Sequence, residues 1–369
     1  KRWSADTCND NMMNENNVKK LIDFTLEITN GCQFSCTGCT VDMEGNSWPT
    51  DSDWNKISDL IDDFDKNEFR PMNLQIGPTD LMTSINRDQI LTSIEVKNLA
   101  SKFLKTAINC AFLDPKLENY VDFGKKLNWL LKGGLVKFVI PFEAYHIDNE
   151  SYVNKIKERI KITLDNMPDV THTKTYLIIN YETSSIYDRE HNKNLTEELI
   201  VKTHHSPLME GFDCGLVLPH GRTNLRLEMN RLSFFNATMK LKDYMVSARQ
   251  KYKDKVDVYD LLPQEGKDFD VVYKAGKLYM TPFVMDAFLS FEDEFLVKKE
   301  WTFDGLYEDY LEGFLSQTEW ALNNPVCKDC QMLPICAERG VHSLMQIMET
   351  TECISPAKEL EHEMFWKSG

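Results

Sequence analysis

The sequence lacks a hydrophobic run long enough to cross a membrane, since no apolar stretch approaches the ~20 residues that a spanning helix needs. Residues 1–4 also lack the apolar core of a signal peptide. Basic residues are few, because 42 Lys and Arg face 58 Asp and Glu and give a formal net charge of -16. Binding nucleic acid through its phosphates requires clustered Lys and Arg. We therefore expect a soluble cytoplasmic protein with neither a membrane nor a nucleic-acid partner.

Cysteine is too sparse and too unevenly placed for a disulfide scaffold, because only ten occur in 369 residues. Seven of the ten form two groups, one early and one late in the chain. Such grouping indicates metal ligation and fits a reducing compartment. The isolated Cys8, Cys110 and Cys214 are of a kind that is commonly a small buried hydrophobe.

The early group lies in residues 31–40, where Cys32, Cys36 and Cys39 follow Cys-x3-Cys-x2-Cys spacing directly after a strand-like run. Soft thiolate ligands select zinc, copper(I) or an iron–sulfur cluster. A closed structural site normally has four protein ligands. Three thiolates on one loop therefore indicate either a distant fourth ligand or an open coordination position.

The late group is a complete set of four thiolates. Cys327, Cys330 and Cys336 follow Cys-x2-Cys-x5-Cys spacing, and Cys353 comes after sixteen more residues. Tetrahedral zinc and an iron–sulfur cluster both accept four thiolates, so the spacing leaves both metals open. With either metal the site would couple ligation to the folding of the C-terminal region.

Strand-like and helix-like segments alternate from residue 23 onward, which predicts parallel β/α packing. The chain has 42% hydrophobic residues and is long enough for two domains. The predicted strands are 24–29, 72–76, 106–113, 136–142, 175–180 and 214–218. The predicted helices are 52–65, 116–132, 149–167, 194–202 and 228–252.

The pattern changes after about residue 254. A hairpin is predicted from strands 269–272 and 277–281, joined across 274–276, with a further strand at 291–297. A helix over 304–322 should end before Pro325. We therefore expect an N-terminal arm over 1–22, a β/α domain over 23–254 and a C-terminal domain over 255–369.

The early cysteine group resembles the signature of the radical S-adenosylmethionine enzymes, although Gly38 stands where many members carry an aromatic residue. The resemblance implies that Cys32, Cys36 and Cys39 hold a four-iron four-sulfur cluster whose fourth iron binds the amino and carboxylate groups of S-adenosylmethionine. It also implies reductive cleavage to a 5′-deoxyadenosyl radical that abstracts a hydrogen atom from a substrate. The implied fold is α/β, a partial (β/α)6 TIM-like barrel, which needs the six β/α units predicted above.

The late group resembles the auxiliary-cluster region of the SPASM and twitch branches of that family. The resemblance implies a small C-terminal α+β domain that holds an auxiliary four-iron four-sulfur cluster. The hairpin region 269–285 contains no cysteine, and Gly340 stands where a further one is typical. One auxiliary cluster, closed by Cys353 and serving electron transfer, is therefore implied.

Further site residues follow from the resemblance and from the rule that sites collect at the carboxyl ends of parallel strands. The turn Gly77, Pro78, Thr79 and Asp80 stands where family members hold the methionine amino group, although such a turn is also ordinary loop chemistry. Glu143 and Asn180 follow later strands, where family members contact the ribose hydroxyls; a solvated strand end is the alternative. Cys214, at the start of the sixth predicted strand, is a candidate hydrogen donor to a substrate radical or a buried cysteine.

The resemblance implies a peptide substrate and a peptide maturase that cross-links, epimerises or oxidises it. It also implies an external electron donor such as flavodoxin or ferredoxin. Residues 1–21 are too short for a leader-recognition domain, so a separate leader-recognition protein is expected if the substrate has a leader. Two alternatives remain, namely a small-molecule dehydrogenase of the twitch type and a non-catalytic zinc protein.

Overall fold

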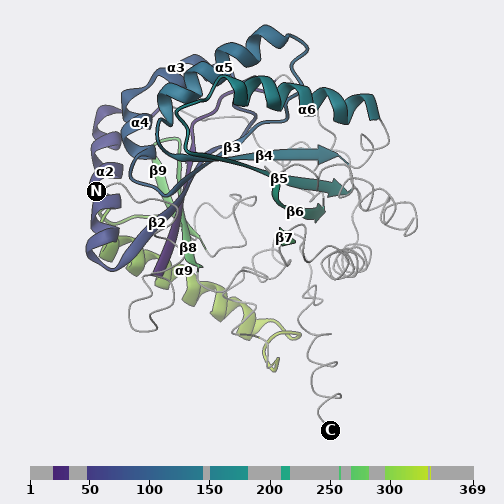
Figure 1. The fold of residues 1–369 in the computed structure, drawn as a ribbon. Helices are drawn as coiled ribbons and strands as arrows, with labels where there is room; N and C mark the ends of the chain where they lie inside the picture. Colours follow the sequence, from purple (N-terminus) through teal and green to yellow (C-terminus); the bar gives the residue numbers. More distant parts are fainter. Residues whose placement is uncertain are drawn as a thin grey trace, which may run out of the picture.

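The computed structural model describes residues 20–32, 48–143, 150–181, 209–216, 257–258, 267–281, 296–330 and 333. Their strands form one sheet of nine, in the order β7-β6-β5-β4-β3-β2-β1-β8-β9. Strands β1 to β6 lie in chain order and are all parallel, which confirms the predicted parallel α/β architecture. Figure 1 shows helices α2 to α6 along the outer side of this curved sheet.

The bounds of the elements are as follows. The strands are β1 Lys20–Glu27, β2 Phe69–Gly77, β3 Lys105–Asn109, β4 Leu135–Glu143, β5 His172–Tyr181, β6 Met209–Leu216, β7 Asp257–Val258, β8 Lys267–Lys274 and β9 Lys277–Thr281. The helices are α2 Asp51–Lys66, α3 Arg87–Thr92, α4 Ile94–Ala100, α5 Leu117–Leu130, α6 Glu150–Asp165 and α9 Phe303–Asn323. Of the helices described, none is both long and apolar enough to span a membrane.

Several predicted boundaries differ from the observed ones. Strand β3 ends at Asn109 and not at residue 113, because the backbone turns there and Phe112 has a φ of 55°. Strand β6 begins at Met209, which pairs with Thr175 of β5, and not at Cys214. The short helices α3 and α4 were not predicted, and the helices predicted over 194–202 and 228–252 lie outside the described residues.

The predicted hairpin is confirmed, and it belongs to the same sheet as the β/α units. Strands β8 and β9 are antiparallel and join through Ala275 and Gly276, which have φ values of 51° and 78°. Positive φ at both central positions is the requirement of a tight two-residue hairpin. Strand β8 also pairs in parallel with β1, so the late part of the chain lies beside the first strand. Of the strand predicted over 291–297, the described part forms one bridge, between Leu296 and Tyr279.

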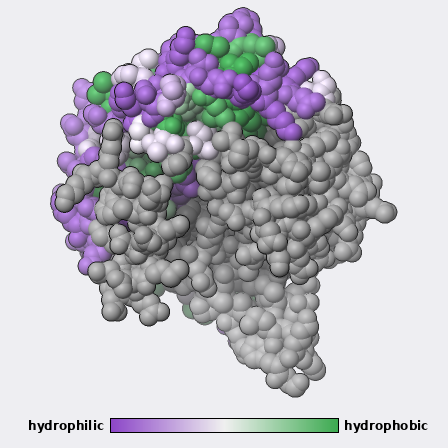
Figure 2. All heavy atoms as spheres, viewed as in Figure 1, coloured by the Kyte–Doolittle hydropathy of each residue, from purple (hydrophilic) through white to green (hydrophobic). Residues whose placement is uncertain are grey.

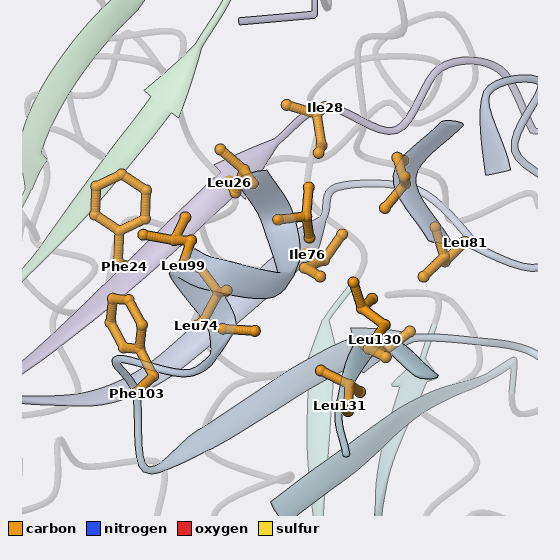
Figure 3. Close-up of a cluster of buried hydrophobic side chains, with 14 of the residues drawn as sticks. Phe24, Leu26, Ile28, Leu74, Ile76, Leu81, Leu99, Phe103, Leu130 and Leu131 are labelled. Carbon is orange, nitrogen blue, oxygen red and sulfur yellow. The ribbon is translucent and has the colours of Figure 1, made fainter. Parts of the chain in front are cut away.

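Strand β1 is buried on both faces, as is typical of parallel sheets covered by helices. Ile22, Phe24 and Leu26 of β1, and Ile28 just after it, have no exposed surface and face the core beneath the helices. Figure 3 shows Phe24, Leu26 and Ile28 beside side chains of β2, α4 and the end of α5. On the outside, Figure 2 shows a largely hydrophilic described surface, with hydrophobic residues gathered toward the top of the view.

Helix α9 is fastened to the first β/α unit. The ring of Phe303 packs against Phe64 of α2 and Phe69 of β2, and the Phe303 amide donates to Asp63 at 2.9 Å. Asp309, which is buried, accepts from the amides of residues 298 and 299 at 2.7 and 2.9 Å. The predicted end before Pro325 is confirmed, since α9 stops at Asn323. These contacts fix the start of the segment that leads to Cys327.

Candidate functional site

Cys32 lies at the carboxyl edge of the sheet, five residues after β1 ends at Glu27. The amides of Ile28 and Thr29 both donate to the carbonyl of Gly77, at 2.9 and 3.0 Å, so this segment runs beside the end of β2. Cys32 is partly exposed. Cys36 and Cys39 lie outside the described residues. The structure therefore places the first predicted ligand at the edge where sites of parallel β/α folds are found.

The predicted turn after β2 lies against the segment that precedes Cys32. The Thr79 amide donates to the Thr29 hydroxyl at 2.9 Å, and the Thr79 hydroxyl donates to the carbonyl of Gly31 at 3.2 Å. The carbonyl of Pro78 accepts from the Asn109 side chain at 3.0 Å. The ends of the first three strands are thus joined by hydrogen bonds, and Cys32 is brought next to residues 77–80.

Asp80 is buried and connects the loop after β2 to the loop after β3. One carboxylate oxygen accepts from the Thr83 amide and hydroxyl at 2.8 and 3.0 Å, and the other accepts from the Ala111 amide. Burial raises the pKa of Asp80, and the hydrogen bonds from Ala111 and Thr83 offset part of that rise. An ionised carboxylate has about four acceptor positions, so roughly one remains for a further donor.

Glu27 is a site residue that sequence reasoning missed. It ends β1, is 4% exposed, and alternates with Leu26 and Ile28, so it faces away from the helix-covered core. Thr25 and Thr29 are buried on that same opposite face. The available signal was a carboxylate between two apolar residues at the end of a predicted strand. The inner side of the sheet near Cys32 is therefore polar and carries a buried acid.

Glu143 and Asn180 are neighbours across the sheet. Both lie at or next to the carboxyl ends of their strands, and they are register partners in the parallel pair of β4 and β5. Cys214 pairs with Ile179. Because β6 begins at Met209, Cys214 lies near the carboxyl end of the strand and not at its start as predicted. The backbone thus brings all three positions to the edge that also carries Cys32.

Cys327 and Cys330 form the two ends of a turn. Asn324 is buried just after α9, and its carbonyl accepts from the amides of Cys327 and Lys328 at 3.1 and 3.0 Å. The Cys330 amide donates to the Cys327 carbonyl at 2.9 Å, which closes a four-residue turn. Cys336 and Cys353 lie outside the described residues. A turn of this kind keeps two thiols near each other, as chelation of one metal centre requires.

The donor sets fit the expected clusters in their chemistry. Cys32 and Cys330 are partly exposed and Cys327 is buried. Cys110 is fully buried beside Asp80, and burial raises the pKa of the Cys110 thiol well above its usual range. A thiol of that kind is a poor ligand, which confirms the prediction that Cys110 is a small buried hydrophobe. Among the described residues no group of three or more ligating side chains is found, since each cysteine group is described only in part.

No family model and no curated protein matches the sequence. Solved structures do match the fold. SuiB of Streptococcus suis bound to S-adenosylmethionine has a TM-score of 0.54 and 13% identity, over 89% of this chain and 75% of SuiB. SuiB bound to the precursor peptide SuiA has a TM-score of 0.52 and 14% identity, over 89% of this chain and 73% of SuiB.

A second protein, anSMEcpe with bound AdoMet and the Cp18Cys peptide, has a TM-score of 0.51 and 9% identity, over 86% of this chain and 88% of that one. At these identities the likeness shows the fold. The β/α part of the fold that the cysteine motif led us to expect is therefore confirmed, whereas the small C-terminal domain stays a prediction.

Proposed function

We propose that this chain is a radical S-adenosylmethionine enzyme that modifies a peptide. The observation that carries the proposal is the position of Cys32, which follows the first of six parallel strands and comes directly after Gly31, whose carbonyl accepts from Thr79 at the carboxyl edge. When bound, a four-iron four-sulfur cluster on Cys32, Cys36 and Cys39 supplies the electron that cleaves S-adenosylmethionine and yields a 5′-deoxyadenosyl radical, which takes a hydrogen atom from the substrate.

The chain's own residues bind and orient the reactants at this edge. The turn of Gly77, Pro78, Thr79 and Asp80 would hold the methionine amino group, because the ionised Asp80 carboxylate uses three of about four acceptor positions and retains about one for an ammonium. Glu143 and Asn180, which are register partners, accept from the ribose hydroxyls. In an epimerisation, Cys214 would donate a hydrogen atom to the substrate radical, and the thiyl radical left on its sulfur would be reduced by one electron from the external donor and take up a proton. Holding these groups in fixed positions and excluding water is the main contribution of the protein.

The second cysteine group holds one auxiliary four-iron four-sulfur cluster that assists electron transfer, with Cys327, Cys330, Cys336 and Cys353 as ligands. The turn between the first two, and the attachment of α9 to α2, support a fixed position for this centre. Zinc is the second candidate for this group, because four thiolates suit both metals.

A peptide substrate is supported by the likeness in fold to SuiB bound to the precursor peptide SuiA and to anSMEcpe bound to the Cp18Cys peptide. The reaction is a cross-link, an epimerisation or an oxidation. An external donor such as flavodoxin or ferredoxin supplies the electron, and a separate protein recognises a leader if the substrate has one. A small-molecule dehydrogenase of the twitch type is the alternative, and turnover of a precursor peptide separates the two.

Anaerobic reconstitution with iron and sulfide tests the proposal. Two clusters require about eight iron and eight sulfide per chain. Replacing Cys32, Cys36 and Cys39 together by Ala should abolish 5′-deoxyadenosine formation under reducing conditions and leave about half of the iron. Zinc without a visible absorption band, or 5′-deoxyadenosine from the triple variant, would refute the assignment.

A further inference from the structure

The segment that leads into Cys32 is held by a short loop between β2 and α3, residues 81–86. The side chain of Asn86 contacts two residues of that segment. Its Oδ1 accepts from the Asn30 amide at 2.9 Å, and its Nδ2 donates to the Ile28 carbonyl at 2.7 Å. One amide side chain therefore bonds to two backbone groups of the segment before the first cysteine.

Asn86 makes these contacts in place of its usual local role. It is the N-cap residue of α3, a position where an Asn side chain ordinarily accepts from an amide of the first helical turn. In this structure Asn86 makes no such side-chain capping bond. A residue that departs from its local preference often has a functional reason, and here the bonds go to the cysteine-bearing segment instead.

Ser84 and Ile85 complete the hold on Asn30 and Gly31. Ser84 is buried, and its Oγ lies 3.0 Å from both the amide nitrogen and the carbonyl oxygen of Asn30 and 2.6 Å from Oδ1 of Asn86. The Ile85 amide donates to the Asn30 carbonyl at 2.8 Å. Both backbone polar groups of Asn30 are thus bonded to the loop.

Ile85 also covers Gly31, the residue directly before Cys32. Gly31 has a φ of 68°, and a Cβ added there would lie 2.6 Å from Cδ1 of Ile85. The Ile85 side chain is 86% exposed, an unusual position for a large apolar residue. The left-handed backbone of Gly31 and the close approach of Ile85 fix the direction in which the chain enters the cysteine loop.

We propose that Ser84 and Asn86 are positioning residues of the three-cysteine site, and that they hold the Cys32 ligand in place through residues 28–31. This inference rests on the proposed function. The contacting groups are neutral, so the loop orders the ligand without adding charge beside three thiolates. Removing a group that orients a metal ligand typically lowers metal affinity by about tenfold or more.

The experiment uses the full chain after anaerobic reconstitution and follows iron release to a chelator. The phase that belongs to this site is the one missing from Cys32→Ala protein. Asn86→Ala and Ser84→Ala should each release the iron of that phase about tenfold faster than wild type. The matched control is Asn67→Ala, because Asn67 likewise donates from its side chain to a backbone carbonyl, that of Asp63, at the end of α2 before β2 begins.

A second readout separates positioning from general stability. Asn86→Asp keeps the acceptor but loses the donor to Ile28 and adds a negative charge near the thiolates. It should lower the reduction potential of the cluster and change the EPR spectrum of its reduced form, whereas Asn67→Ala should change neither.

Each outcome decides between specific statements. Equal release rates in wild type, Asn86→Ala and Ser84→Ala, with an unchanged spectrum in Asn86→Asp, overturn this inference and leave the proposed function intact. If neither alanine variant folds, the inference is wrong, because the loop then stabilises the whole fold and does not act on the cysteine site alone. Wild-type protein without the iron phase refutes the proposed function itself.

Discussion

Replacing Asp80 by Asn tests whether this buried carboxylate connects the loops after β2 and β3. The wild-type carboxylate accepts from the amide and hydroxyl of Thr83 and from the Ala111 amide. An Asn side chain has one oxygen, so its NH₂ group must face one of these donors. That NH₂ group leaves at least one buried donor unpaired, and we expect a net loss of about 2 kcal/mol at pH 7.

Urea unfolding of wild type and Asp80→Asn measures this difference. Asp88→Asn is the control, because Asp88 is an exposed acid whose bonds to Lys126 and Arg87 are worth less than about 1 kcal/mol. A variant as stable as wild type, or more stable, would show that the contacts of Asp80 do not stabilise the fold.

The same pair of proteins should differ in pH dependence. Because burial raises the pKa of Asp80, the folded protein holds a proton at Asp80 at a pH where the unfolded chain has lost it. The stabilisation of the folded state by this bound proton is fully present below the ordinary aspartate pKa of about 4. It is lost as the pH rises through the raised pKa of Asp80. The stability of wild type relative to Asp80→Asn should therefore increase as the pH falls toward about 4, and a decrease would contradict the direction of the shift.

Three further predictions concern other parts of the chain. Cys353→Ala should lose about four iron per chain but still form 5′-deoxyadenosine, and unchanged iron content would remove Cys353 from the ligand set. Gly31→Ala should lower the free energy of unfolding in urea by about 1–2 kcal/mol, because alanine is strained at a φ of 68°. Adding Ile85→Ala to that variant should not restore the stability, since the backbone strain remains. Phe303→Ala should lower the free energy of unfolding by about 3 kcal/mol and speed hydrogen exchange at the start of α9. Exchange equal to that of wild type would show that the Phe303 ring does not hold α9 against α2.

The six parallel strands could be predicted because they appear in the sequence as short apolar runs between helical patterns. Their ends could not. The end of β3 depends on the turn at Phe112. The start of β6 includes Glu210, at a shift in the register with β5, and Gly211, which pairs with Tyr176, and both residue types have a poor strand preference. Helices α3 and α4 have six and seven residues, too few for a helical period to be recognised.

The candidate site was predictable only in its cysteines and in the turn after β2. Spacing identified Cys32 because ligands on one loop lie close in the sequence. Ser84 and Asn86 act on residues more than fifty positions earlier, and they do so through backbone groups, which leave no trace in residue type. The sequence does contain a sign of Glu27 as a candidate site residue, namely a charged residue within an apolar predicted strand.

The pairing of β8 with β1 has a consequence for how the protein is made. The ribosome releases β1 early in synthesis. One edge of this strand has no hydrogen-bonding partner until residues 267–274 have been made. An unpaired strand edge invites wrong partners, and contacts between distant parts of a chain form slowly. The strand that precedes Cys32 is therefore completed late in synthesis. In a nascent chain truncated before β8, the first predicted metal ligand should follow a strand that lacks one of its two neighbours.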